Sequence, residues 1–272
     1  MVLKKDQMVF WKENGFLVLK NFMTKNTMNY INSYLDDRWT SPEKEKSEIV
    51  IDIFIGTPQE RRVAIKDASL NARRLPHKIN DIYLESKKIR EIILNNKLSQ
   101  ILNQLLSGRP IIINTLSLEF GSQQGYHTDS LFMTPPKDLN LIATWLALED
   151  VEPFAGPLKY FPGSHKIKPF LFSSGKMTVI PDEMENYESY MNQQLEKKKL
   201  TEEIFIAETG DLFIWHSQLY HGGSNIKKRK LTRRSLITHY FKEGDFEGDI
   251  QPVNEYGLFL NRNRQPVKTK QL

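Results

Sequence analysis

The sequence predicts a mainly β fold, a sandwich or barrel of short strands that follows a mostly helical region. Two observations indicate it. The spacing of apolar residues changes from helical to alternating near Pro110, and polar turns separate several short apolar runs after that point. With 272 residues, of which 39% are hydrophobic, the chain can bury a substantial core. No repeat, low-complexity tract or flexible linker divides it, so we expect a single domain over residues 1–272.

The first 110 residues favour helices, with one early strand. Residues 15–19 form a short apolar run typical of a strand, and Thr24 can cap a helix after it. The apolar face of that helix would hold Met28, Ile31 and Leu35. A second helical stretch begins near Ser86 and ends at Gly108. Its apolar positions are Ile89, Ile92, Ile93, Leu98, Ile101, Leu102 and Leu105. We therefore expect residues 1–110 to be a helical, mixed packing region.

Strands dominate the predicted core, residues 111–245. Alternation begins where Leu116, Leu118 and Phe120 interleave with Thr115, Ser117 and Glu119. Further candidate strands cover residues 139–148, 158–161, 211–215 and 235–241. A helical stripe of Met184, Tyr187, Met191 and Leu195 interrupts them. We expect a helical insertion near residues 173–200, which is either a solvated decoration or a lid over a pocket, and a mobile basic tail over residues 246–272.

Composition excludes several kinds of chemistry. The chain has no cysteine, which rules out disulfides, thiolate zinc sites, iron–sulfur clusters and a cysteine nucleophile, so any metal must bind to nitrogen and oxygen. The formal charge is +5, but much of the excess is local, and we interpret it as solvated surface rather than a nucleic-acid site. No signal-peptide run and no span of about 20 apolar residues is present. We expect a cytoplasmic protein without a membrane span.

Two of the six histidines lie in sequence contexts that suit a metal site. His127 and Asp129 form a His-x-Asp unit, and residues two apart in a strand project to the same face. His221 follows a predicted strand and could complete the set at the same mouth of a barrel. Two imidazoles and one carboxylate on one face of iron(II) leave three coordination positions open. A His-x-Asp pair alone is common in unrelated chains, so further residues must support this hypothesis.

An arginine near residue 233 strengthens the hypothesis. The strand that begins at Arg233 would place a guanidinium inside the barrel, where it could bind a distal carboxylate in bidentate fashion. Arg234 is the competing choice, and both could instead face water at a basic strand end. Periodicity alone does not separate the two arginines.

The chain resembles the phytanoyl-CoA dioxygenase family of iron(II)- and 2-oxoglutarate-dependent oxygenases. The resemblance covers most of the chain and rests on several motifs in the family's order. These are Trp11-Lys-Glu-Asn-Gly-Phe-Leu-Val-Leu19, His127-Thr-Asp129, Trp145-Leu-Ala-Leu-Glu149, Gly156-Pro-Leu-Lys-Tyr-Phe-Pro-Gly-Ser-His165, Gly210-Asp211, His221 and Arg233-Arg-Ser-Leu-Ile-Thr-His-Tyr240. It implies a double-stranded β-helix, that is, a cupin-like jelly roll with flanking helices.

The resemblance also implies roles for individual residues. Iron(II) would bind to His127, Asp129 and His221, while Arg233 would hold the 2-oxoglutarate tail and Trp145 would line the cofactor pocket. Lys66 could be a further cofactor contact. The family usually has a serine two residues after the distal histidine, where this chain has His-Gly-Gly-Ser, so either Gly223 or Ser224 occupies that position, and Ser224 is a candidate contact. The other histidines, His77, His165, His216 and His239, are interpreted as structural. Trp215 and Tyr220 are interpreted as core, and either could instead border the substrate.

The resemblance implies that the protein hydroxylates a C–H bond in a small metabolite. It would bind iron(II), consume 2-oxoglutarate and O2, and release succinate and CO2. The basic charge favours an anionic substrate. Asp129 stands where related halogenases carry a small residue, which favours hydroxylation. Two alternatives are a non-catalytic jelly-roll module that binds a metal or ligand, and a metal-dependent isomerase or hydrolase of cupin type, which would have more histidine or glutamate ligands and no anchoring arginine.

Overall fold

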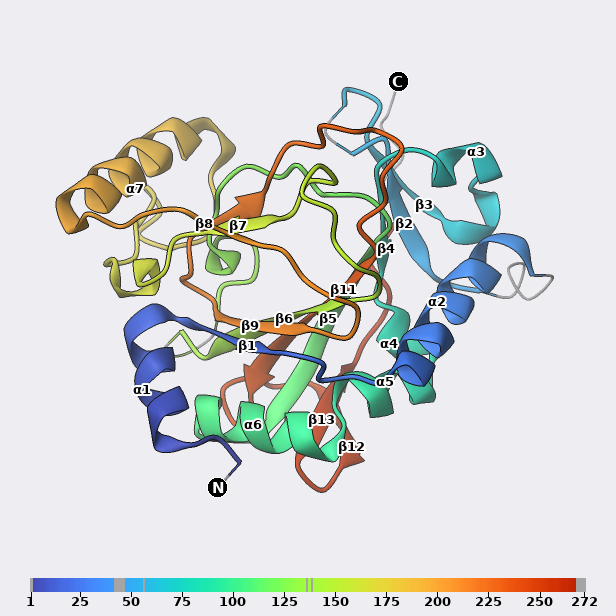
Figure 1. Ribbon diagram of the computed structural model, residues 1–272, viewed down its shortest axis with the longest axis horizontal. Helices are drawn as coiled ribbons and strands as arrows, with labels where there is room; N and C mark the ends of the chain where they lie inside the picture. Colours follow the sequence, from blue (N-terminus) through green and yellow to red (C-terminus); the bar gives the residue numbers. More distant parts are fainter. Residues whose placement is uncertain (1, 42–46, 56, 136, 138, 268–272) are drawn as a thin grey trace.

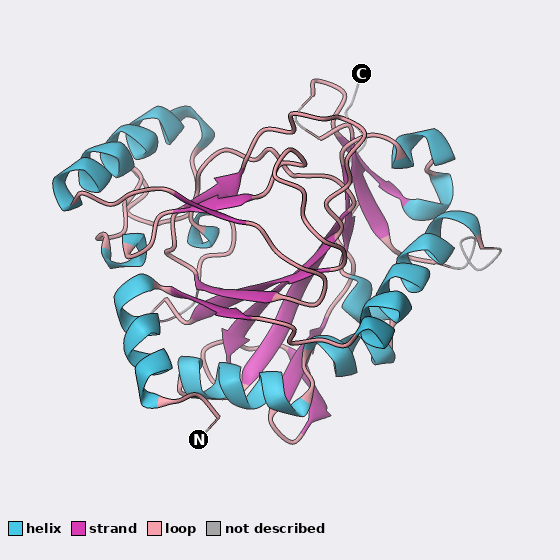
Figure 2. Ribbon diagram, in the orientation of Figure 1, coloured by secondary structure: helices cyan, strands magenta, loops and turns pink. Residues whose placement is uncertain are grey.

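The computed structural model describes residues 2–41, 47–55, 57–135, 137 and 139–267 (Figure 1). Strands meet in the centre and helices lie outside them (Figure 2). The helices are α1 (Lys5–Asn14), α2 (Lys25–Thr40), α3 (Leu70–Arg73), α4 (Ile82–Glu85), α5 (Lys87–Ile93), α6 (Asn96–Leu106) and α7 (Met184–Lys198), with 3-10 turns η2 (Ile65–Asp67), η3 (Asp129–Leu131), η4 (Ser164–Lys166) and η5 (Pro181–Glu183). The strands are β1 (Phe16–Leu19), β2 (Val50–Ile53), β3 (Arg61–Ala64), β4 (His77–Asn80), β5 (Pro110–Leu118), β6 (Leu141–Ala147), β7 (Leu158–Tyr160), β8 (Glu203–Phe205), β9 (Leu212–His216), β10 (His221–Gly223), β11 (Ser235–Lys242), β12 (Asp249–Asn254) and β13 (Gly257–Asn261).

Two sheets form the core of the fold. The large sheet has the order β1-β9-β6-β11-β5-β4-β2-β3, with β13 also paired to β5 and β12 paired to β13. The small sheet has the order β10-β7-β8. Neighbouring strands are antiparallel except for β13 and β5. The mainly β prediction is therefore confirmed, with an antiparallel sheet and several helices.

Alternation along the central strands separates two hydrophobic clusters. On β6, Ala143 and Trp145 face the small sheet and pack with Phe213 and with Leu158, whereas Leu146 faces the helices. Figure 1 shows the small sheet on one side of the large sheet and α1 and α6 on the other. The cavity described below lies on the side of the small sheet.

Sequence analysis missed part of the sheet in the first 110 residues. The strands β2, β3 and β4 extend the large sheet, and β4 pairs with β5. Each is four residues long, and β3 reads Arg61-Arg-Val-Ala64, which has no apolar alternation. These strands form because an already built edge offers hydrogen-bond partners, so tertiary context outweighs local pattern.

The C-terminal segment is also more ordered than expected. Residues 249–261 form the hairpin of β12 and β13, and β13 joins the large sheet. Beyond it, Arg262 pairs with Asp81 at 2.7 Å, so at least this part of the predicted basic tail is docked on the fold. Lys268 and Lys270 lie outside the described residues.

The predicted insertion is present as η5 and α7, at the left of Figure 1. Tyr187, Met191 and Leu195 of α7 are buried in a cluster that includes Leu131 and Tyr220. No residue of α7 lines the cavity that contains the metal motif. The helix therefore packs against the segment after Asp129 and lines no part of the cavity. None of the described helices is both long and apolar enough to cross a membrane.

His216, at the end of β9, predicts a pH dependence of stability. Burial, together with the neighbouring His165, lowers its pKa to about 4. The backbone N–H of Gln218 donates to Nδ1 of His216 at 3.1 Å, a bond that protonation at Nδ1 would break. An unfolded histidine binds its proton near pH 6.5, so the free energy of unfolding should fall as pH drops from about 6.5 toward 4.

We expect the metal-free protein to lose up to about 2 kcal/mol through His216 between pH 7 and pH 5. The His216→Gln variant keeps an acceptor but cannot take up the proton, so its loss over the same interval should be smaller. Urea unfolding of both proteins at the two pH values measures the difference. Equal losses in wild type and variant would show that His216 does not carry this dependence.

Candidate active site

Two backbone hydrogen bonds bring the two histidines of the motifs together. The backbone N–H of His127 donates to the carbonyl of His221 at 2.9 Å, and the N–H of His221 donates to the carbonyl of His127 at 3.0 Å. This isolated bridge connects the segment after β5 to β10. Residues far apart in the sequence thus become direct neighbours, and their ring centres are 4.4 Å apart.

Hydrogen bonds to the backbone orient both imidazoles in the same way. Nδ1 of His127 lies 2.9 Å from the carbonyl of Gly125, and Nδ1 of His221 lies 2.9 Å from the carbonyl of Leu219. A carbonyl only accepts, so each Nδ1 carries the proton and each Nε2 presents a lone pair. This tautomer is the one that binds a metal through Nε2.

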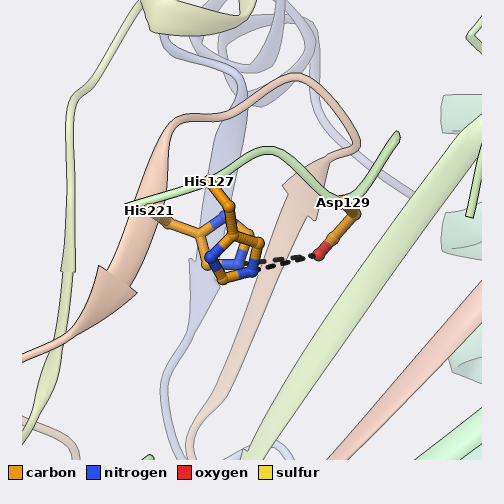
Figure 3. Close-up of side chains that lie close together, drawn as sticks. All are labelled: His127, Asp129 and His221. Atoms are coloured by element: carbon orange, nitrogen blue, oxygen red, sulfur yellow. Dashed lines mark ion pairs between the residues drawn. The ribbon is translucent and has the colours of Figure 1, made fainter. Parts of the chain in front are cut away.

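Asp129 faces both Nε2 atoms from the start of η3 (Figure 3). Its Oδ1 lies 3.9 Å from Nε2 of His127 and 3.6 Å from Nε2 of His221. Its other oxygen, Oδ2, accepts a hydrogen bond from Nε1 of Trp215 at 2.7 Å. One carboxylate oxygen is therefore tied to the fold while the other points between the imidazoles.

The three residues form a buried metal-binding geometry. One ligand atom from each of His127, Asp129 and His221 can be chosen so that all lie within 4.8 Å of one another. Burial, together with the proximity of His221, lowers the pKa of His127 to about 4. For Asp129, burial acts to raise the pKa, but His221 and His239 outweigh it and hold the pKa below its usual range. Neutral imidazole and ionised carboxylate are the forms that bind metals.

Arg233 lies in the same cavity and is only 2% exposed. Its Nη1 donates to the carbonyl of Gly156 at 3.0 Å, and its guanidinium carbon lies 5.6 Å from the ring centre of Trp145. Its Nε has no hydrogen-bond partner among the described residues. Burial lowers the pKa of Arg233 to about 10, which leaves it charged at neutral pH. Among the described residues no carboxylate forms an ion pair with it, so this cavity contains a buried cation suited to an anionic ligand.

The structure separates Arg233 from Arg234. The guanidinium of Arg234 pairs with Asp36 of α2 at 2.7 Å, on the side of the helices. Strand alternation accounts for the difference, because neighbouring residues project to opposite faces. Only Arg233 lines the cavity with the metal motif.

The ring of Trp145 belongs to the same cavity. Its ring is on the inner face of β6, is 1% exposed and lines the cavity. Within the part of the chain that the structure describes, its buried Nε1 has no hydrogen-bond partner, and neither has Oγ of Ser235. Ser235 is two residues beyond Arg233 and so shares its face of the strand. Unpartnered polar atoms in a buried site are unfavourable unless a ligand completes their hydrogen bonds.

Two candidate cofactor contacts lie elsewhere. Lys66 is exposed in η2, beyond β3 at the edge of the large sheet, and does not line the cavity. Ser224 follows β10, and alternation directs it away from the face shared by His221 and Gly223. Its backbone N–H donates to the carbonyl of Pro157, and it too is absent from the lining. Neither residue is therefore carried into the proposal below.

Other residues line the cavity that sequence analysis did not assign to it. Lys78 reaches it from β4, and His239 and Trp215 reach it from β11 and β9. The alternating pattern of the strand could have indicated His239. It is spaced in steps of two residues from Arg233, Ser235 and Ile237, so all four share one face. No local pattern could have indicated Lys78, since it arrives through the pairing of β4 with β5.

Gly223 has a steric reason to lack a side chain. A Cβ atom there would lie 2.4 Å from Oγ of Ser122 and 2.8 Å from the backbone nitrogen of Gln123. The side chain of Ser122 therefore occupies the space beside β10, and Ser122 also lines the cavity. The position two residues after the distal histidine is glycine because another segment of the chain packs against it.

Comparisons with known proteins agree with this geometry. The family model described as phytanoyl-CoA dioxygenase matches residues 11–235. A phytanoyl-CoA dioxygenase domain-containing protein 1 homolog from Dictyostelium discoideum is 26% identical over 193 residues, which cover 61% of this chain and 66% of that protein. The peroxisomal phytanoyl-CoA dioxygenase of Mus musculus is 23% identical over 255 residues, covering 88% of this chain and 68% of that protein. The chain thus matches about two thirds of the length of each curated relative.

A solved structure shows the same fold. EctD from S. alaskensis, crystallised with 2-oxoglutarate and 5-hydroxyectoine, superposes with a TM-score of 0.66 at 14% identity, over 90% of this chain and 78% of that one. At this identity the likeness concerns the fold, whereas the family match covers most of the sequence. The chain belongs to the phytanoyl-CoA dioxygenase family of iron(II)- and 2-oxoglutarate-dependent oxygenases.

Proposed function

We propose that this protein hydroxylates a C–H bond of a small metabolite and converts 2-oxoglutarate and O2 to succinate and CO2 as it does so. The observation that carries the proposal is one buried cavity that contains both the His127, Asp129 and His221 cluster and the unpaired guanidinium of Arg233. A module that only bound a metal would not need the buried guanidinium of Arg233. The two facing sheets support a double-stranded β-helix as the framework.

The donor set fits iron(II). Two neutral imidazoles and one carboxylate occupy one side of an ion and leave the opposite side for ligands. When bound, iron(II) supplies the redox chemistry that activates O2. The protein contributes geometry: the backbone carbonyls of Gly125 and Leu219 hold the two imidazoles, and Trp215 holds Asp129.

The remaining polar groups fit a dicarboxylate. Arg233 is suited to bind the distal carboxylate, which would complete its unpartnered Nε, and Ser235 and Trp145 offer further donors. Lys78 also lines the cavity, and its ammonium lies 4.0 Å from Oδ2 of Asp52. Fixing the co-substrate between these residues and the metal would orient it before reaction and exclude water from its tail.

A second cavity supports a small-molecule substrate. It has a volume of about 350 Å³ and shares Lys78, Leu118, Ser122 and Gln124 with the first. Its other lining residues include the apolar Phe120 and the polar Gln123. The volume lies in the range of small-ligand pockets, roughly 300–1,000 Å³, and the mixture of surfaces suits a polar metabolite. The overall positive charge favours an anionic one.

Anaerobic titration tests the proposal. Iron(II) and 2-oxoglutarate are added to the metal-free protein while the weak visible charge-transfer band of the chelate is recorded, and succinate is measured after O2 is admitted. We expect the band and the slow formation of succinate even without substrate. Iron(II) binding without a band or succinate would contradict the proposal and favour the non-catalytic module.

A matched pair of lysine variants tests the cavity assignment within the same assay. Lys78→Ala should raise the 2-oxoglutarate concentration at half-saturation by about tenfold, because it removes a partly buried charge from the cavity. Lys66→Ala should leave it unchanged, because Lys66 is exposed elsewhere. The reverse result would return Lys66 to the site.

A further inference from the structure

Gly125 lies at the junction of the first and second cavities. It lines the second cavity, and its carbonyl accepts the hydrogen bond from Nδ1 of His127, whose ring lines the first. Its neighbour Gln124 lines both cavities. A side chain at residue 125 would therefore lie close to the metal cluster without taking part in it.

Neither packing nor backbone conformation requires a glycine at residue 125. A Cβ atom there would have no atom of the described residues within 4 Å beyond its chain neighbours, and φ of Gly125 is not positive. Other glycines that line the cavities differ. A Cβ at Gly121 would lie 2.7 Å from the carbonyl oxygen of Ala155, and one at Gly222 would lie 2.9 Å from that of Gln124. Those two glycines allow backbone segments to pack closely, whereas Gly125 leaves open space in the second cavity.

Hydrogen bonds to β10 and to the segment after it hold the backbone around Gly125 in place. The backbone N–H of Gly223 donates to the carbonyl of Gln124 at 2.9 Å. Oε1 of Gln123 accepts a hydrogen bond from the backbone N–H of Ile226 at 3.1 Å. The open space beside Gly125 therefore has a fixed wall, which a site that selects ligands by size requires.

The second cavity combines an apolar wall with a polar one. Leu118 and Phe120 supply apolar surface, and Gln123 and Gln124 supply amide groups from the segment before the metal motif. The charged residues of the lining, one of each sign, are Lys78 and Glu60. A compact molecule with an apolar body and hydrogen-bonding groups along one edge fits such a lining.

We infer that Gly125 determines the size of the substrate that reaches the metal, and that this substrate is a compact amphipathic molecule. Its apolar body lies against Leu118 and Phe120, and the part nearest the metal occupies the space beside Gly125. A larger residue at position 125 narrows this approach but leaves the metal ligands in place. The inference rests on the proposed function, because it treats the second cavity as the substrate site.

A thiol introduced at residue 125 tests whether this position lies beside the metal. The chain has no cysteine, so Gly125→Cys contains a single thiol, which is labelled with bromotrifluoroacetone. Fluorine NMR is recorded with paramagnetic cobalt(II) or with diamagnetic zinc(II) bound. The signal should be lost with cobalt(II) and remain with zinc(II). The same label on Lys66→Cys, at an exposed position outside both cavities, should remain visible with either metal. Equal behaviour of the two labels would overturn the inference.

Two fluorinated probes of different size test the selection itself. Para-fluorophenol and the larger fluoronaphthol each have an apolar ring system and one hydroxyl group, and fluorine NMR measures their binding to the zinc(II) protein with 2-oxoglutarate bound. The wild type should bind both. Gly125→Leu should weaken fluoronaphthol by about tenfold and para-fluorophenol by no more than about threefold, because overpacking penalises the larger ligand more. Equal losses of the two probes, or no binding of either to the wild type, would contradict the inference.

Metal and co-substrate binding provide the control in the same variant. Gly125→Leu keeps the backbone carbonyl that holds His127, and residue 125 does not line the first cavity. Its affinities for cobalt(II) and 2-oxoglutarate should therefore stay within about twofold of wild type. Should Gly125→Leu fail to fold, the labelled Gly125→Cys protein adds bulk after folding and should show the same loss of fluoronaphthol.

The two levels of the proposal fail in different ways. A wild type that binds neither cobalt(II) nor 2-oxoglutarate would overturn the proposed function itself. A wild type that binds both, with probe affinities that Gly125→Leu leaves unchanged, would overturn only the role of Gly125.

Discussion

His221→Ala is expected to abolish metal binding at micromolar concentrations and to reduce 2-oxoglutarate turnover by at least about 100-fold. The substitution removes one of three donors, and the remaining pair, His127 and Asp129, cannot enclose one face of an ion. Loss of an orienting group alone costs about 10- to 100-fold in affinity, so loss of a ligand should exceed that. The backbone bridge between residues 127 and 221 remains possible in the variant. The fold should therefore survive.

Cobalt(II) titration and succinate formation measure the effect, with circular dichroism to verify folding. His165→Ala is the control, because His165 contacts the carbonyl of Lys12 and lies outside the cavity. It should bind cobalt(II) like the wild type. Metal binding that survives in His221→Ala but is lost in His165→Ala would show that the ligand set has been assigned incorrectly.

Arg233→Gln is expected to raise the dissociation constant for 2-oxoglutarate by about 30-fold or more while cobalt(II) binding is retained. Removing one partner of a buried, hydrogen-bonded charge pair costs about 2–5 kcal/mol, and each 1.4 kcal/mol is tenfold in affinity. Arg233→Lys should give an intermediate loss, because an ammonium keeps the charge but cannot bind a carboxylate in bidentate fashion. Isothermal titration of 2-oxoglutarate into the cobalt(II) protein measures both effects.

The stability of the metal-free variant provides a second test of Arg233. A structural arginine would destabilise the protein when replaced, but burying a charge without an anionic partner is itself unfavourable. Arg233→Gln should consequently leave the melting temperature of the metal-free protein unchanged or raised. Arg234→Gln is the control: it breaks the ion pair with Asp36 and should not affect 2-oxoglutarate binding. An unchanged affinity in Arg233→Gln would remove Arg233 from the co-substrate site.

Much of the site could be predicted because it lies on strands whose sequence shows their faces. The family motifs single out Trp145 and Arg233, and the structure places both in the cavity. The spacing of His127 and Asp129 suggests one face, although the structure holds Asp129 in a 3-10 turn rather than in a strand. Two residues can thus be brought to one side of an ion by a turn as well as by a strand.

Other parts of the site depend on contacts between distant segments. Lys78 enters the cavity because β4 pairs with Leu118 of β5, and a four-residue strand carries too little pattern to indicate its partner. Ser122 lies beside β10 only because Gly223 leaves room for it. Lys66 and Ser224, the two other candidate contacts, do not line the cavity. The similarity of a few residues does not determine on which face or edge of a sheet they lie.

The mainly β class and the family could be predicted from the sequence, because periodicity and motif order are properties of local segments. The same motifs name the histidines, aspartate and arginine of the proposed chemistry. The pairing of distant segments places Arg234 against Asp36 and Arg233 in the cavity. It also packs α7 against the segment after Asp129 and brings His239 next to Asp129. The physical reason is that burial, hydrogen-bond direction and the absence of an ion-pair partner are properties of packed neighbours. The order of residues along the chain does not show which of them become neighbours, because strand pairing decides this.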